Sequence, residues 1–263
     1  MFDVLIPAGV LGGLGAVFGA ALSYASQVFA VETDPREGEI LEVLPGANCG
    51  GCGFAGCANY ASAVVSGEAA PNLCVPGGAD VTAQVAAVMG VEADAPERVV
   101  AFVRCSGGVR SERQYDYSGL GDCFAALNAI GGGPLTCRFG CLGLGSCTRI
   151  CPEGALSLVN GVAFVDRERC TACGQCVTHC PKHLITRIPY NAAIRVGCNS
   201  HAKGAALRKL CEAGCIGCGI CAKNCPANAI SLDDNLAVID YEKCTHCGLC
   251  AEKCPRKIIE VEG

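Results

Sequence analysis

Three runs of four cysteines, each ending in Cys-Pro, constrain this chain more than any other feature. Each run has the spacing Cys-x2-Cys-x2-Cys-x3-Cys-Pro, and the runs begin at Cys170, Cys215 and Cys244. Three closely spaced thiolates can bind three corners of a cubane iron–sulfur cluster, while the fourth reaches a neighbouring cluster. Zinc is the alternative for a single Cys-x2-Cys pair, but three complete runs favour paired [4Fe–4S] clusters.

The runs belong to an internal repeat with an offset of 74 residues, in which residues 151–185 align without a gap onto 225–259. Each copy predicts a cysteine loop, a short helix, two short strands joined by a turn, a second cysteine loop and a helix. We therefore expect two bacterial-type 2[4Fe–4S] ferredoxin-like units, called unit 1 and unit 2 below.

The first cysteine loop of unit 1 departs from the pattern, because Leu144 falls where unit 2 has Cys218. Cys137, four residues before Cys141, is the available replacement, although unit 2 has Cys211 at the corresponding place. We expect four crossed ligand sets and a spare Cys211. The sets are Cys137, Cys141, Cys147 and Cys180; Cys151, Cys170, Cys173 and Cys176; Cys215, Cys218, Cys221 and Cys254; and Cys225, Cys244, Cys247 and Cys250.

Four earlier cysteines predict a separate cluster site, with zinc as the weaker alternative. They are Cys49, Cys52, Cys57 and Cys74. Glycines around them would let the backbone wrap closely and direct N–H groups at the sulfurs. Five [4Fe–4S] clusters then use 20 of the 24 cysteines. The others are expected to be buried structural thiols, with a further cluster or a redox pair as the alternative: Cys105, Cys123, Cys198 and Cys211.

The N-terminal segment has no charged residue from Val4 to Val31. These 28 residues would form a helix of about 42 Å, longer than the roughly 30 Å hydrocarbon core of a bilayer. A cleaved signal peptide is the alternative, but no basic residue precedes the run and the run is too long. We expect a single-pass anchor in the inner (plasma) membrane, and Arg36 favours a cytoplasmic body.

The expected fold class is α+β, with a transmembrane helix, a small four-Cys domain and two ferredoxin-like units. Helices are expected at 55–66 and 80–89, and strands at 99–104 and 193–197. The expected division is an anchor at 1–31, the four-Cys domain at 32–95, a connecting segment at 96–136, unit 1 at 137–190 and unit 2 at 191–263.

Charge is distributed unevenly along the chain. The net charge is −5, but residues 1–160 carry −8 and residues 161–263 carry +3. An acidic chain does not suit nucleic acid, which requires a basic face. No Ser-His-Asp order, carboxylate pair or phosphate-binding loop is evident, so we expect no catalytic residues and no substrate site on this chain.

Three segments carry a family resemblance: Asn48–Cys57, Cys141–Cys147 and Gly214–Cys218. Together with the N-terminal glycine-rich span, they resemble the B subunit of the Rnf complex, the ion-translocating ferredoxin:NAD oxidoreductase. The resemblance covers the whole chain. It implies a membrane-anchored iron–sulfur subunit that relays single electrons between soluble ferredoxin and the other membrane and peripheral subunits. Flavin and NAD sites would belong to those subunits.

Two other functions remain open at this level. One is a polyferredoxin subunit of another membrane oxidoreductase, and the other is an iron–sulfur scaffold protein. If the resemblance holds, basic residues in the C-terminal half would steer an acidic ferredoxin into place; a solvated face without a partner is the alternative. These residues are Lys182, Lys203, Lys209, Lys223, Lys253, Arg256 and Lys257.

Overall fold

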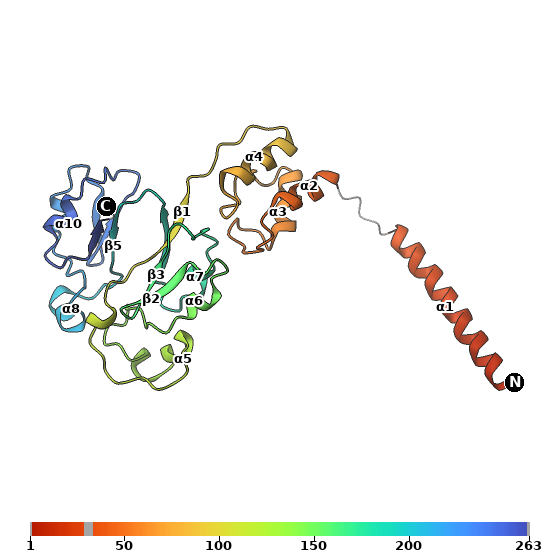
Figure 1. Ribbon diagram of the computed structural model, residues 1–263, viewed down its shortest axis with the longest axis horizontal. Coiled ribbons are helices and arrows are strands. Elements are labelled where there is room, and N and C mark those ends of the chain that lie inside the picture. The colour runs from red at the N-terminus through yellow and green to blue at the C-terminus, as the bar shows by residue number, and fades with distance from the viewer. Residues whose placement is uncertain (1, 29–33, 262–263) are drawn as a thin grey trace.

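The computed structural model describes residues 2–28 and 34–261 of the chain, with side chains from 11–26 and 34–261. The fold is mixed helix and strand, as expected. Figure 1 shows α1 apart from a small helical domain, which precedes a larger body containing the strands. All the strands are arranged in two-stranded sheets.

Helix α1 covers Phe2–Val28. Its side chains between residues 11 and 26 are mostly exposed, including Leu11, Phe18 and Leu22. Over the described residues, no helix is both long and apolar enough to cross a membrane. The anchor expected at 1–31 also includes residues 1 and 29–31, which lie outside the described residues.

The small domain consists of α2 (Pro35–Val43), α3 (Cys57–Val65) and α4 (Gly78–Met89). Helix α2 begins where Asp34 accepts a hydrogen bond from the Arg36 N–H, with proline at the first helical position. It packs against both α3 and α4, and Ile40, Tyr60 and Val85 form the centre of the core. Helices α3 and α4 match those expected from the sequence to within two residues, whereas α2 was not expected.

One strand from the expected connecting segment 96–136 pairs with a strand of unit 1. Strand β1 (Val99–Val103) lies antiparallel to β4 (Ile185–Pro189). Between them lie α5 (Cys123–Leu127), α6 (Ser146–Ile150), β2 (Leu156–Val159), β3 (Val162–Val165) and α7 (Gln175–His179), with short 3-10 turns at Gly108–Arg110 and Ile130–Gly132.

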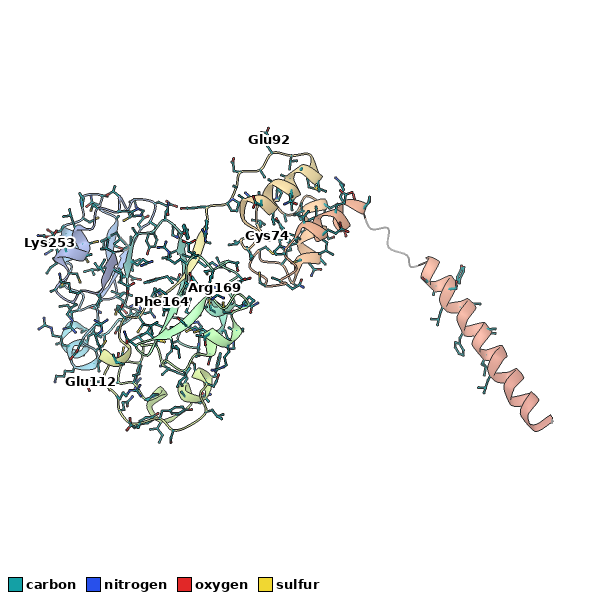
Figure 2. All side chains as sticks on the ribbon, in the orientation of Figure 1. Cys74, Glu92, Glu112, Phe164, Arg169 and Lys253 are labelled. Carbon is teal, nitrogen blue, oxygen red and sulfur yellow. The ribbon has the colours of Figure 1, made fainter. Side chains whose placement is uncertain are left out.

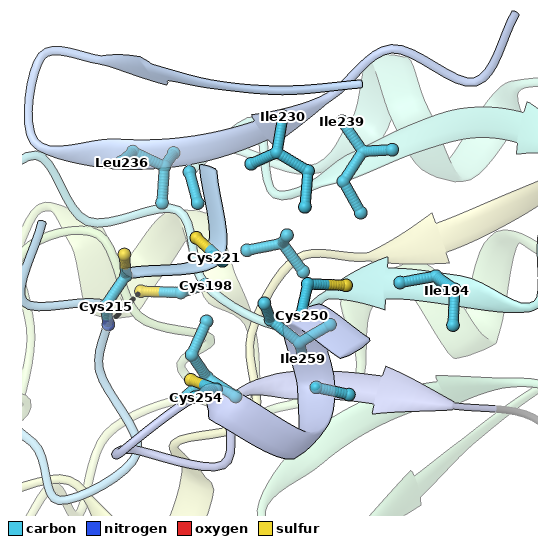
Figure 3. Packing of buried hydrophobic residues seen from close by; sticks show 14 of the residues in the cluster. Ile194, Cys198, Cys215, Cys221, Ile230, Leu236, Ile239, Cys250, Cys254 and Ile259 are labelled. Carbon is cyan, nitrogen blue, oxygen red and sulfur yellow. Dashed lines mark hydrogen bonds between the residues drawn. The ribbon is translucent and has the colours of Figure 1, made fainter. Parts of the chain in front are cut away.

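The second unit repeats this arrangement. Strand β5 (Ile194–Val196) pairs antiparallel with β8 (Ile259–Val261), as β1 does with β4. The other elements are α8 (Gly204–Leu210), α9 (Ile220–Lys223), β6 (Ile230–Asp233), β7 (Leu236–Ile239) and α10 (Leu249–Lys253). Aliphatic side chains and cysteines share its core, which Figure 3 shows around Cys221, Cys250 and Ile259.

Each unit contains a tight hairpin with the expected turn chemistry. Val159 pairs with Val162 across Asn160-Gly161, and both turn residues have positive φ, of 49° and 75°. Asp234-Asn235 makes the corresponding turn between β6 and β7. Two-residue turns of this kind require left-handed backbone, which Asn, Asp and Gly adopt most easily.

The two units are joined by backbone hydrogen bonds near their first cysteine loops. The Ser106 N–H donates to the Gly197 carbonyl at 2.8 Å, and Ser111 forms an isolated antiparallel bridge with Cys211. The units therefore form a continuous body at this point, which we call the junction.

Candidate iron–sulfur cluster sites

The cysteine loops of both units share one local construction. A glycine in left-handed backbone caps the start of each short helix, at Gly145, Gly174, Gly219 and Gly248. The helix then ends just before a Cys-Pro pair, because a proline disfavours helical backbone at the residue that precedes it. Cys180 and Cys254, for example, are both extended, with ψ of 110° and 113°. The sequence thus directs the third cysteine of each loop inward and turns the fourth away.

The four-Cys domain brings Cys49, Cys52, Cys57 and Cys74 together. Burial is the main cause of a raised pKa at Cys74, and the charges of the other three cysteines raise that pKa further. Asn48 holds the start of α3, since its side-chain oxygen accepts the Cys57 N–H at 2.8 Å. Figure 2 labels Cys74 within the helices of this domain.

The cysteines expected for the second site of unit 1 lie around one cavity. A cavity of about 10 Å³ is lined by Cys151, Cys170, Cys173 and Cys176. Backbone N–H groups point at its sulfurs: Ala155 donates to Cys151 Sγ at 3.3 Å and Ala101 to Cys170 Sγ at 3.5 Å. Such hydrogen bonds stabilise thiolate ligands and influence cluster potentials.

The first site of unit 1 differs from the expectation in one residue. A cavity of about 20 Å³ is lined by Cys123, Cys141, Cys147 and Cys180. Cys137 does not line it. Cys123 stands beside this loop because its N–H donates to Ser146 Oγ at 2.7 Å, and that hydroxyl in turn donates to Asp122 at 2.8 Å. Asp122 also caps α5 by accepting the Phe124 and Ala125 N–H groups.

Sequence reasoning missed Cys123 because it lies 18 residues before Cys141, outside any recognised ligand spacing. One signal could have indicated it. Ser146 is a buried hydroxyl, 3% exposed, at the position where unit 2 has Ile220. A hydroxyl thus replaces the aliphatic side chain of unit 2 at this repeat position, and a buried hydroxyl requires a hydrogen-bond partner.

The cysteines expected for the first site of unit 2 also lie around one cavity. A cavity of about 20 Å³ is lined by Cys215, Cys218, Cys221 and Cys254. The second site, with Cys225, Cys244, Cys247 and Cys250, repeats a contact of unit 1, since the Ala229 N–H donates to Cys225 Sγ at 3.3 Å. The charges of Cys244 and Cys247 act on Cys250, whose pKa is raised mainly by burial.

Burial governs the protonation of these thiols before any metal binds. It raises the pKa of Cys147 and Cys176 to about 12, and that of Cys141 and Cys221 to about 11. Such thiols stay protonated at neutral pH, so metal must displace the protons to bind thiolates.

The spacing of the cysteine side chains differs from that of a site for a single metal ion. Within the described ranges, no group of three or more His, Cys, Asp or Glu side chains is spaced to hold a single metal ion. A cubane cluster instead spreads its thiolates around a core of iron and sulfide. A separate cavity of about 640 Å³ lies between β1, β3 and the junction, and Cys105 is the one cysteine among the described residues that line it.

Family models match three parts of the chain. A model described as "Putative Fe-S cluster" matches residues 44–76, a 4Fe-4S binding domain matches 163–186, and a 4Fe-4S dicluster domain matches 214–258. These matches cover the four-Cys domain site and parts of both units. They support iron–sulfur clusters as the cofactors.

Curated relatives extend the similarity along the whole chain. The B subunit of the proton-translocating ferredoxin:NAD(+) oxidoreductase complex of Clostridium ljungdahlii is 49% identical over 88% of this chain and 82% of its own length. The B subunit of the ion-translocating oxidoreductase complex of Methanosarcina acetivorans is 44% identical over 99% of this chain and its own full length. The chain belongs to the family of Rnf complex B subunits.

A third relative and the matched domains agree with this family. The B subunit of the Na(+)-translocating ferredoxin:NAD(+) oxidoreductase complex of Acetobacterium woodii is 43% identical over 92% of this chain and 73% of its own length. Membership of the Rnf B-subunit family makes the chain a subunit of an oxidoreductase complex. Its 4Fe-4S domains fit an electron-transfer role.

The sites of this member of the Rnf B-subunit family are arranged as neighbours. Burial is the main reason that the pKa of Cys173 is raised. Cys49 of the four-Cys domain lies close enough for its charge to raise that pKa further. Cys176 acts in the same way on Cys147. Adjacent ligand sets are the arrangement that electron relay requires.

Proposed function

We propose that the chain is the electron-relay subunit of an Rnf-type complex, passing single electrons between soluble ferredoxin and membrane redox subunits. Bound [4Fe–4S] clusters would supply the one-electron chemistry. The observation that carries the proposal is that neighbouring ligand sets lie close together. Gly51 lies between two of them, since a Cβ there would be 3.4 Å from Cys49 Sγ and 3.2 Å from the Cys173 carbonyl oxygen. A storage or scaffold protein has no need of linked sites.

The proposal includes five ligand sets, four of which are the sets expected from the sequence. The first site of unit 1 takes Cys123 in place of Cys137. The chain's own residues hold thiolates at each site, and backbone N–H groups offset part of the negative charge. The proposed domain division is the expected one, except that unit 1 includes β1.

The N-terminal segment is proposed to anchor the subunit in the plasma membrane, with the iron–sulfur body on the cytoplasmic side. The uncharged run from Val4 to Val31 and the exposure of Leu11, Phe18 and Leu22 support this. Exposed apolar side chains along a helix need lipid or neighbouring helices to cover them. Sodium carbonate extraction of membranes tests it, because an anchored chain stays in the pellet.

Reduction by ferredoxin tests the relay. The full chain, loaded with clusters under anaerobic conditions, should be reduced by catalytic amounts of reduced ferredoxin, as measured by bleaching of its visible absorbance. Clusters that instead transfer to an apo-protein, without reversible reduction, would favour a scaffold protein and contradict the proposal.

The basic half of the chain is proposed to dock ferredoxin. Reversing charge at Lys253 and Lys257, both on unit 2, should slow ferredoxin-linked reduction several-fold at low salt and flatten its salt dependence. Reversal at Arg36 and Arg113, which lie in the acidic half, is the matched control. Equal effects of both pairs would exclude docking at unit 2.

A further inference from the structure

Four cysteines remain after the five proposed sites, and they lie together at the junction. A cavity of about 20 Å³ is lined by Cys105, Cys137, Cys198 and Cys211. Cys137, Cys198 and Cys211 are each less than 9% exposed. We propose that these residues, which we call the junction site, hold a sixth [4Fe–4S] cluster between the two ferredoxin-like units.

The four thiols line one small cavity and so lie close to one another. The charges of Cys105 and Cys211 both act on Cys137, and the charge of Cys105 also acts on Cys198. Gly107 brings the backbone against two of the sulfurs, because a Cβ there would lie 3.2 Å from Cys211 Sγ and 3.6 Å from Cys105 Sγ. A side chain at this position would occupy the space that the cluster needs.

Both units contribute to the site in the same way. The Arg104 N–H donates to the Leu184 carbonyl and the Gly197 N–H to the Ile258 carbonyl, each at 2.8 Å. Leu184 and Ile258 are 74 residues apart, as are Cys137 and Cys211. Cys105 and Cys198, which follow the two donors, are therefore equivalent. Each unit supplies one cysteine after its edge strand and one before its first cysteine loop.

Hydrogen-bond donors point at the junction sulfurs, as they do at the proposed cluster ligands. Cys105 Sγ accepts the Cys141 N–H at 3.4 Å, and Cys198 Sγ accepts the Cys215 N–H at 3.3 Å, the contact drawn in Figure 3. Cys198 Sγ also accepts the Ser200 N–H at 3.4 Å. Four thiols packed together as structural residues have no use for these donors, whereas thiolates on a cluster do.

Three cationic side chains from different parts of the chain lie near the site. Arg256 donates to the Cys211 carbonyl at 2.7 Å, and Lys182 donates to the Arg138 carbonyl beside Cys137 at 2.8 Å. Arg104, near Cys198, has a buried Nε without a hydrogen-bond partner in the part of the chain that the structure describes. A buried cationic N–H without an acceptor is costly, and an anionic cluster would offset that cost.

The position of the site gives it a role. Cys141 and Cys215, whose N–H groups contact the junction sulfurs, are ligands of the first sites of units 1 and 2. A cluster at the junction would therefore accept one electron from the cluster of one unit and pass it to the cluster of the other. Without it, the two units form separate relays.

Metal content of the full chain tests the inference, which rests on the proposed function. With six sites, the anaerobically reconstituted chain should hold about 24 iron atoms, against about 20 for the five proposed sites. The variant with Cys137→Ser and Cys211→Ser should hold about 20. Ser231→Ala, a control at an exposed residue of β6 outside the site, should keep about 24.

The outcomes separate this inference from the proposed function. About 20 iron atoms in the unchanged chain, with no loss in the double variant, would overturn the sixth cluster and leave the five sites intact. One zinc per chain together with about 20 iron atoms would also overturn it. Loss of about four iron atoms in a second variant, Cys218→Ser with Cys221→Ser, tests the five sites separately. If the first variant does not fold, the iron and zinc content of the unchanged chain decides.

Discussion

The two ferredoxin-like units have the same framework but complete their first cluster site differently. Unit 2 supplies Cys215, Cys218 and Cys221 from one continuous loop, together with Cys254. Unit 1 has Leu144 at the place of Cys218, and Cys123 reaches the site from a separate helix. A cluster site therefore depends on where four thiols meet in space, and a ligand absent from a loop can come from another segment.

The largest expected effect comes from removing that ligand in each unit. Cys123→Ala and Cys218→Ala should each remove or degrade one cluster, with a loss of up to about four iron atoms per chain. Iron and acid-labile sulfide analysis measures the loss. Adding Leu144→Cys to Cys123→Ala should restore the iron, because it recreates the loop of unit 2. Full iron content in Cys123→Ala alone would remove the difference between the units.

Core packing should be equivalent in the two units. Leu184 and Ile258 occupy corresponding places beside the first sites and are 1% and 2% exposed. Leu184→Ala and Ile258→Ala should each lower the free energy of unfolding by about 2–5 kcal/mol through lost burial and a residual cavity.

The effect of these two core variants is measured as the concentration of guanidinium chloride at which half of the visible absorbance is lost. Val109→Ala, at a residue that is 74% exposed, is the control and should change little. If one variant lowered the free energy of unfolding much less than the other, the clusters of that unit would contribute more to its stability than its side chains do.

The smallest effect should come from the hydroxyl that positions Cys123. Ser146→Ala removes the acceptor of the Cys123 N–H, which should cost about 1 kcal/mol and speed iron loss from unit 1 alone. Iron release to a chelator, followed over time, measures it. Thr148→Ala, in the same helix but with its hydroxyl bonded to the Gly145 carbonyl, is the control. Equal release rates in the two variants would contradict a positioning role for Ser146.

The sequence by itself determined the repeat, its elements and most of the candidate ligands. The Cys-Pro pairs, the capping glycines and the Asn160-Gly161 turn act through neighbouring backbone, so their effects are readable from local order. The ferredoxin-type spacing likewise places three thiolates on one loop. These features account for α6, α7, α9 and α10 and for the two hairpins as the structure shows them.

Tertiary structure alone decided the partners of Cys123 and of the four junction cysteines. Cys105 and Cys211 are 106 residues apart, and no spacing rule relates them. Pairing of β1 with β4 and of β5 with β8 carries Cys105 and Cys198 to the first cysteine loops, and the Ser111–Cys211 bridge brings the two units together. The physical reason is that local spacing determines which thiols share a loop, whereas strand pairing between distant segments determines which loops meet.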